Sequence, residues 1–299
     1  MNKLTASPHI IKASLFAIFA FFFMAVFGVL TKVACDHGDP IWVSFITYCM
    51  ATLVTAVFIL PKGMDALKSR RYSFLILRAV SGTVASFLYM LSIRYIPIIN
   101  STLLFNTAPI FIPLLAVIVL KAHEEKNIWY AVILGFTGVI VIIKPGLNIL
   151  TNPGNLIGLL SGFALAIAYL TMKFLTATET GLRIIFYYFA IGSLMQISLL
   201  GYVSHAPSTE VFIYAMLCGV AMMAAQMGLV KAYQYATASE VGVYQYTSVV
   251  FVAMIEWAVW GRTPSLSDFI GFLLVSAAGI FIIVTSKPAA RKSNARAQK

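Results

Sequence analysis

Long apolar stretches alternate with short polar or turn-forming segments along almost the whole chain. A helix that crosses a bilayer needs about 20 mostly apolar residues. Ten such stretches lie between the charges and the turn residues, at 13–32, 41–60, 73–93, 99–120, 128–144, 155–173, 184–203, 210–231, 239–260 and 266–286. The connections between them are too short to form a domain. The pattern therefore predicts an all-α integral membrane protein with ten transmembrane helices.

The composition excludes a soluble globular domain and a disordered chain. Of the 299 residues, 61% are hydrophobic and only 10% are charged, with a mean hydropathy of +0.92. A soluble domain is about half apolar and about a quarter charged, and disordered chains are poorer still in apolar residues. The first stretch, Ala13–Thr31, exceeds the apolar core of a signal peptide and is expected to remain as an anchor.

The distribution of the basic residues predicts the orientation. With the N-terminus in the cytoplasm, seventeen Lys and Arg residues, Arg78 among them, fall on the cytoplasmic side, and four (Lys32, Arg94, Lys144 and Arg262) fall outside. Because cytoplasmic segments carry the excess of Lys and Arg, both termini should be cytoplasmic in an inner membrane. The cytoplasmic segments would be 1–12 and the basic tail 287–299, which should lie against anionic headgroups. The net charge of +11 thus points to the membrane and not to nucleic acid.

The chain also repeats itself at an interval of 140–141 residues. Under this shift Tyr48 falls on Tyr188, Phe111 on Phe251 and Ala131 on Gly271. Each half, 13–146 and 147–286, then holds five predicted helices. Since five is odd, the second half would enter the membrane in the opposite direction. Two inverted five-helix repeats around a central cavity are the layout of secondary transporters, with the substrate near the midplane.

Several short motifs carry a family resemblance over roughly residues 13–286. They are YIPI at 95–98, FNTAPIF at 105–111, GFTGVIVIIKPG at 135–146, YQYTSVVF at 244–251 and WAVWG at 257–261. These resemble the EamA-type proteins of the drug/metabolite transporter superfamily. The resemblance implies a ten-helix bundle of two inverted repeats that carries small metabolites. The Gly-Glu pair common in the family after its fourth and ninth helices is absent, since those positions read KAHEE from 121 and Gly261-Arg262.

The fourth stretch carries Thr102, Asn106, Pro109 and Pro113 on one helical face. Each proline removes an amide donor and frees the carbonyl four residues earlier, which must then face protein or a wet cavity. One interpretation is that this face lines the cavity. The other is a kink packed against neighbouring helices, with Asn106 bonded to the backbone.

The equivalent stretch of the second half holds the other candidates. Tyr246 aligns with Asn106 in the repeat and follows Tyr244 and Gln245, and Glu256 is an acid placed inside the same predicted span. An intramembrane acid is a functional hypothesis by default, here for ion coupling. Glu256 could also reach water or pair with Lys32 or Arg94. Further polar side chains within the spans are Tyr89, Tyr169 and Gln226. Lys32 and Lys173 are repeat equivalents at helix ends, where each could bind an anion or cap carbonyls.

No recognisable catalytic or energy-coupling motif accompanies these residues. The sequence lacks a Walker-type glycine loop, a nucleophile–His–acid set and a metal-ligand cluster, so we expect no enzymatic activity, cofactor or metal. We predict a gradient-driven transporter of small polar or zwitterionic metabolites, such as amino acids, amines or S-adenosylmethionine, acting as a monomer or homodimer. The alternatives are a carrier of riboflavin or small carboxylates and, in another class, a non-transporting membrane scaffold or an intramembrane enzyme.

Overall fold

The computed structural model describes residues 8–93, 95–96, 98–121, 125–143, 152–203, 205–261 and 265–285, and these residues contain helices and no strands. The first half contains α1 (Pro8–His37), α2 (Pro40–Ile59), η1 (Leu60–Lys62), η2 (Met64–Leu67), α3 (Tyr72–Ile93), α4 (Ile98–Phe105), α5 (Ala108–Leu120) and α6 (Lys126–Ile143). The second half contains α7 (Pro153–Leu175), α8 (Gly181–Ile197), η4 (Leu200–Tyr202), α9 (Thr209–Tyr235), α10 (Ala238–Val243), η5 (Tyr244–Tyr246), α11 (Thr247–Trp260) and α12 (Leu266–Thr285).

Each predicted span falls on one helix or on two or three consecutive helical elements. Eight helical segments are long and apolar enough to cross a membrane, and Lys126–Ile142 is a shorter apolar helix. The remaining predicted span, 239–260, is divided among α10, η5 and α11, none of which alone has the length of a membrane helix. The protein is a multi-pass membrane protein.

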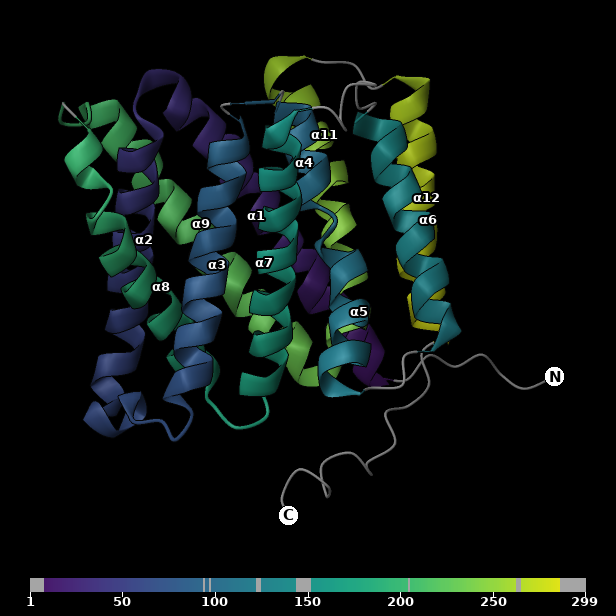
Figure 1. Ribbon diagram of the computed structural model, residues 1–299, viewed down its shortest axis with the longest axis horizontal. Coiled ribbons are helices and arrows are strands. Elements are labelled where there is room, and N and C mark those ends of the chain that lie inside the picture. The colour runs from purple at the N-terminus through teal and green to yellow at the C-terminus, as the bar shows by residue number, and fades with distance from the viewer. Residues whose placement is uncertain are drawn as a thin grey trace.

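The helices form two rows that face each other (Figure 1). One row runs α8, α3, α7, α4 with α5, and α6; the other runs α2, α9, α1, α10 with α11, and α12. Contacts between α2 and α8 close one end of the bundle and contacts between α6 and α12 close the other, on opposite sides in Figure 1. The region between the rows is the interior of the molecule.

The contacts of the two halves match under the 140-residue shift. The pair α1 and α9 corresponds to α7 and α3, and the pair α1 and α11 corresponds to α7 and α5. The two helices of each of these four pairs pack against each other. The helices that close the ends of the bundle, α2 with α8 and α6 with α12, are themselves repeat equivalents.

The two spans that carry most of the predicted site residues are broken at equivalent places. The first separates into α4 and α5 at Asn106–Thr107, and the second changes to a 3₁₀ turn at Tyr244–Tyr246. The prediction of one kinked helix over 99–120 was therefore too simple. Pro109 occupies the second position of α5, where its missing amide costs no helical bond. Both the backbone N–H and the side chain of Asn106 donate to the Thr102 carbonyl, at 3.0 and 2.9 Å, so Asn106 is bonded to the backbone as one interpretation predicted.

The first helix is longer than predicted. It continues past Lys32 to His37, whose Nδ1 lies 2.8 Å from the Val33 carbonyl oxygen, and ends before Gly38. An ideal Cβ at Gly38 would lie 2.7 Å from Val211, so the glycine allows α1 to end against α9. Lys32 is therefore within the last turns of α1 and not at its end.

Candidate functional site

An arginine lies in the interior between the two rows of helices. Arg78 projects from α3 and is 1% exposed, which makes it the largest fully buried side chain of the described residues. Its Nη2 donates to the Gln226 Oε1 of α9 at 2.9 Å, and its guanidinium carbon lies 4.2 Å from the Tyr188 ring centroid. Its Nε and Nη1 have no hydrogen-bond partner. Among the described residues, no carboxylate forms an ion pair with Arg78.

Four buried tyrosines surround this cation. The hydroxyls of Tyr48 and Tyr188 are 3.0 Å apart, and the ring centroids of Tyr169 and Tyr233 are 6.0 Å apart. Tyr169, Tyr188 and Tyr233 all lie within electrostatic reach of the Arg78 guanidinium. The Tyr233 hydroxyl is buried without a hydrogen-bond partner. We call this set the arginine–tyrosine centre: Arg78, Gln226, Tyr48, Tyr169, Tyr188 and Tyr233.

Helical spacing and missing side chains explain why these groups meet. Gln226 and Tyr233 are seven residues apart on α9 and so share one helical face. A Cβ at Gly82, one turn after Arg78, would collide with Arg78 Nη1 and lie 2.9 Å from Tyr188 Cε2. A glycine at position 82 therefore leaves the space in which the guanidinium packs on the tyrosine ring.

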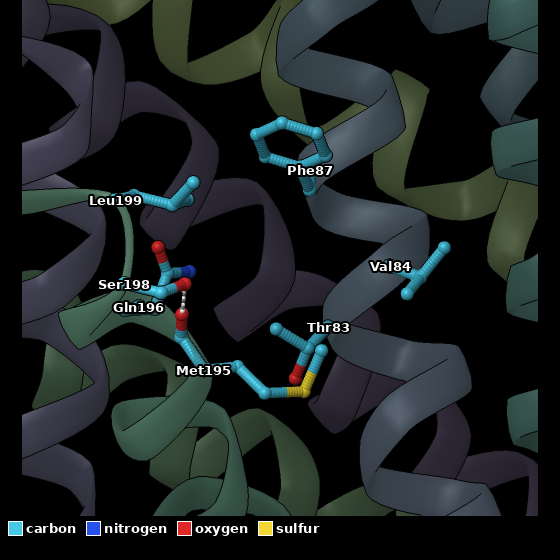
Figure 2. A pocket seen from close by; sticks show the side chains of 7 residues that line it. All are labelled: Thr83, Val84, Phe87, Met195, Gln196, Ser198 and Leu199. Carbon is cyan, nitrogen blue, oxygen red and sulfur yellow. Dashed lines mark hydrogen bonds between the residues drawn. The ribbon is translucent and has the colours of Figure 1, made fainter. Parts of the chain in front are cut away.

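A small cavity lies between α3 and α8, close to this centre (Figure 2). Its volume is about 140 Å³, and it is lined by Thr83, Val84, Phe87, Met195, Gln196, Ser198 and Leu199. Thr83 connects the cavity to the centre, because its Oγ1 and the Tyr48 ring both pack on Gly192. Pockets for metabolites usually measure about 300–1,000 Å³. The cavity between α3 and α8 is smaller than such a pocket.

The residues predicted at the break of the fourth and ninth spans form a second polar group. Gln245 Nε2 donates to Asn106 Oδ1 at 3.4 Å, which joins the two halves of the chain at their equivalent breaks. The Tyr244 hydroxyl lies 2.6 Å from Ser14 Oγ and donates to the Gly279 carbonyl at 3.2 Å. Tyr246 is fully buried and its hydroxyl has no hydrogen-bond partner.

The predicted site residues therefore separate into two places. Tyr169 and Gln226 belong to the arginine–tyrosine centre, whereas Thr102, Asn106, Pro109, Tyr244, Gln245 and Tyr246 belong to the breaks. Tyr89 joins the second group, with its hydroxyl 3.0 Å from Thr102 Oγ1. None of these residues lines the cavity between α3 and α8.

The coupling candidate Glu256 forms an ion pair. Its Oε1 lies 3.1 Å from Lys32 Nζ, and the two side chains are 19% and 48% exposed. The same ammonium lies 4.7 Å from the Trp260 ring centroid, and this ring is itself half exposed. Arg94, the other partner considered, lies outside the described residues. The repeat equivalent of the first lysine, Lys173, instead donates to the Tyr233 carbonyl at 2.6 Å and so binds the C-terminal part of α9.

The sequence prediction missed Arg78 as a site residue. The charge count assigns it to the cytoplasmic side, together with Lys68, Arg70 and Arg71. The structure places it six residues into α3, about 9 Å along the helix axis, and buries it. The sequence does contain a signal for Arg78, because it is a cation well inside an apolar stretch. Cations in such positions normally face the interior of a helix bundle.

In the described part of the chain, the protein is an all-helical, polytopic membrane bundle with a buried, charged and aromatic centre between its two rows of helices. The model of the EamA-like transporter family matches residues 11–144 and again 152–285. The chain belongs to this family of the drug/metabolite transporter type, and the two matches cover both halves of the bundle.

Characterised proteins similar to this chain are transporters. The chain is 25% identical over 274 residues to the pseudopaline exporter CntI of Pseudomonas aeruginosa, covering 91% of this chain and 96% of that one. It is 23% identical over 261 residues to the S-adenosylmethionine uptake transporter of Rickettsia prowazekii, covering 87% and 88%. A solved crystal structure aligns with a TM-score of 0.76 over 93% of this chain and 98% of its own, at 14% identity, which supports the fold alone.

Proposed function

We propose that this protein is a gradient-driven transporter that carries small polar or zwitterionic metabolites, such as amino acids, amines or S-adenosylmethionine, across the inner membrane. The observation that carries the proposal is the arginine–tyrosine centre. It places a charge, hydrogen-bond donors and aromatic faces between the two rows. Among the described residues Arg78 has no counter-ion, so its burial would only destabilise the protein if it bound no solute. Glu256 remains the candidate for coupling transport to a proton gradient.

The proposal includes ten membrane crossings in two inverted five-helix units, 13–146 and 147–286, with both termini in the cytoplasm. The contacts between α2 and α8 support the inversion. Trp42, near the start of α2, donates to the His205 carbonyl beyond the end of α8 at 2.7 Å. Arg183, near the start of α8, donates to the Ala66 carbonyl beyond the end of α2 at 2.7 Å. Two repeat equivalents that run antiparallel are what an inverted repeat requires. Residues 1–7 and the basic tail lie outside the described residues.

The similar proteins support the substrate class without fixing the direction of transport. One relative is an exporter and another is an uptake transporter. S-adenosylmethionine, the substrate named for the second, carries an α-amino group and an α-carboxylate. An arginine with unpaired donors next to four tyrosines suits a solute of that kind better than an apolar one.

Counterflow in proteoliposomes tests the proposal. Purified protein is reconstituted, loaded with one unlabelled metabolite and challenged with the same labelled compound outside. The panel contains amino acids, polyamines, S-adenosylmethionine, riboflavin and short carboxylates. We expect transient accumulation of one class, reduced at least tenfold by Tyr188→Ala, which removes the ring under Arg78, and unchanged by Tyr130→Ala on the exposed face of α6. Absence of counterflow for the whole panel, with folded protein, would favour a non-transporting scaffold.

A further inference from the structure

We propose that Arg78 is the receptor for a carboxylate group of the substrate, and that Tyr233 donates the accompanying hydrogen bond. This inference rests on the proposed function and narrows it: the transported solutes carry a carboxylate, and amines that lack one are excluded. Three N–H donors of the guanidinium, one on Nε and two on Nη1, have no acceptor. The Tyr233 hydroxyl is an additional donor without a partner.

The burial of this centre argues for an anionic ligand. An unpaired charge in a protein interior is costly, and so is a buried donor without an acceptor. The cation–π contact with Tyr188 and the bond to Gln226 offset only part of this cost. The helices around Arg78 nevertheless hold it 1% exposed. An anion bound to the free donors would complete the site.

The charge and the geometry select a carboxylate among the possible anions. A guanidinium presents parallel N–H groups that match the two oxygens of a carboxylate. One carboxylate neutralises the single charge of Arg78, whereas a dianionic phosphate would leave one negative charge buried. The nearby cation Lys173 is directed to the Tyr233 carbonyl. The phenol donors and ring faces of the centre also suit an organic solute better than a free inorganic ion.

The present conformation shows how the site could be reached. The cavity between α3 and α8 ends at Thr83, five residues after Arg78. From Thr83 a continuous series of contacts leads through Tyr48 and Tyr188 to the guanidinium. Tyr48 and Tyr188 are repeat equivalents from opposite rows, and their mutual hydrogen bond must open for a solute to enter from this side.

Matched pairs of ligands test the proposal on the purified full-length protein in lipid nanodiscs. The pairs differ only in the carboxylate: L-methionine and L-methioninamide, L-phenylalanine and L-phenylalaninamide, phenylacetate and phenylacetamide. Affinity is measured from the ligand-dependent rise in the thermal unfolding midpoint. We expect at least one carboxylate to bind at least ~30-fold more tightly than its amide, because truncation of one partner of a buried charge pair costs about 2–5 kcal/mol. Sodium chloride and inorganic phosphate at equal ionic strength serve as anion controls.

Three variants locate the effect. Arg78→Gln should abolish the preference for the carboxylate, and Tyr233→Phe, which keeps the ring, should reduce it several-fold. Arg71→Gln removes an exposed arginine at the start of α3 and should retain the preference. If Arg78→Gln does not fold, the Tyr233→Phe variant and the ligand pairs still decide whether this centre binds the carboxylate.

Several results would overturn the proposal: no carboxylate of the set binding at millimolar concentration, equal affinity within every pair, equal stabilisation by chloride or phosphate, or a preference that survives Arg78→Gln. The outcome is separable from that of the proposed function. Counterflow of a solute without a carboxylate would disprove the Arg78 assignment and leave the carrier intact. Carboxylate binding at Arg78 without any counterflow would disprove the carrier and leave the site intact.

Discussion

Two cations of this protein lie in opposite environments, and the contrast separates their roles. Lys32 is about half exposed, pairs with Glu256 and lies over Trp260, so water and a carboxylate both stabilise its charge. Such partly exposed pairs typically contribute no more than about 1 kcal/mol. Arg78 is buried, and among the described residues its guanidinium contacts an amide oxygen and a tyrosine ring but no acid. Its placement is therefore hard to attribute to stability, and the binding of an anion accounts for it.

The Lys32–Glu256 pair gives a prediction about coupling. Glu256→Gln should change the free energy of unfolding by less than about 1 kcal/mol, because the pair is partly exposed. If the carboxylate exchanges the coupling proton, the variant should retain counterflow but lose the pH dependence of net accumulation. Accumulation in proteoliposomes at several imposed pH gradients measures this. Glu210→Gln, at an exposed glutamate near the start of α9, is the control. An unchanged pH dependence in Glu256→Gln would remove Glu256 from the mechanism.

At the scale of the elements, α6 and α12 show how helices approach closely without large side chains. An ideal Cβ at Gly138 would lie 2.9 Å from the Gly271 carbonyl oxygen, and one at Gly271 would lie 2.7 Å from the Gly138 carbonyl oxygen. Small residues allow such contacts between membrane helices, where van der Waals packing holds helices together. The contact between α6 and α12 closes one end of the bundle.

Gly138→Ala should therefore destabilise the protein. The added methyl group meets backbone, which cannot rotate away, so we expect a loss of about 1–3 kcal/mol from overpacking. Gly28→Ala in α1 is the matched control, since nothing lies within 4 Å of its Cβ. That variant should be neutral or more stable by about 0.5–1 kcal/mol, the usual gain of Ala over Gly in a helix. Thermal unfolding in nanodiscs measures both; equal midpoints for the two variants would contradict the close approach.

The helices themselves could be predicted from the apolar pattern, whereas the exact form of their breaks and the partners that meet in the polar centre could not. Hydropathy reports how many apolar residues lie between charges, and it does not distinguish one helix from α4 followed by α5. The break at Asn106 depends on its side-chain bond to Thr102 and on Gln245 from the other half, which is a tertiary contact. Arg78 follows a basic segment in the sequence, so its burial depends on Gln226 and Tyr188, more than one hundred residues away.

At the scale of the whole molecule, the duplication places equivalent residues opposite each other. Tyr48 and Tyr188 are 140 residues apart and meet through their hydroxyls, and Thr52 and Ser193 meet one turn away at 3.0 Å. In the proposed inverted repeat, contacts between equivalents would lie near the pseudo-two-fold axis. The arginine–tyrosine centre contains these two tyrosines but a single arginine, so the two halves contribute differently to it. That asymmetry gives the site one anion-binding side within a nearly symmetric bundle.

The inversion of the two halves can be tested with one pair of equivalent turns. The turn η1 (Leu60–Lys62) after α2 recurs 140 residues later as η4 (Leu200–Tyr202) after α8. Met64 is 71% exposed beside the first turn and Tyr202 is 82% exposed in the second. Figure 1 shows one connection below α2 and the other above α8, at opposite ends of these helices. The bonds from Trp42 to His205 and from Arg183 to Ala66 likewise require that α2 and α8 run antiparallel. In an inverted repeat they lie on opposite sides of the membrane; in a parallel repeat they share one side.

Cysteine labelling should therefore separate the two sites. Met64→Cys and Tyr202→Cys are introduced singly after the three native cysteines are replaced by alanine, and right-side-out membrane vesicles are treated with a membrane-impermeant maleimide. We expect Tyr202→Cys to react directly and Met64→Cys to react only after permeabilisation, because the connection beside Met64 carries Lys62, Lys68, Arg70 and Arg71 and should be cytoplasmic. Reaction of both cysteines from the same side would contradict the inverted repeat. Reaction of Met64→Cys alone from outside would keep the inversion and reverse the orientation, which would place the cavity beside Thr83 on the cytoplasmic side of Arg78.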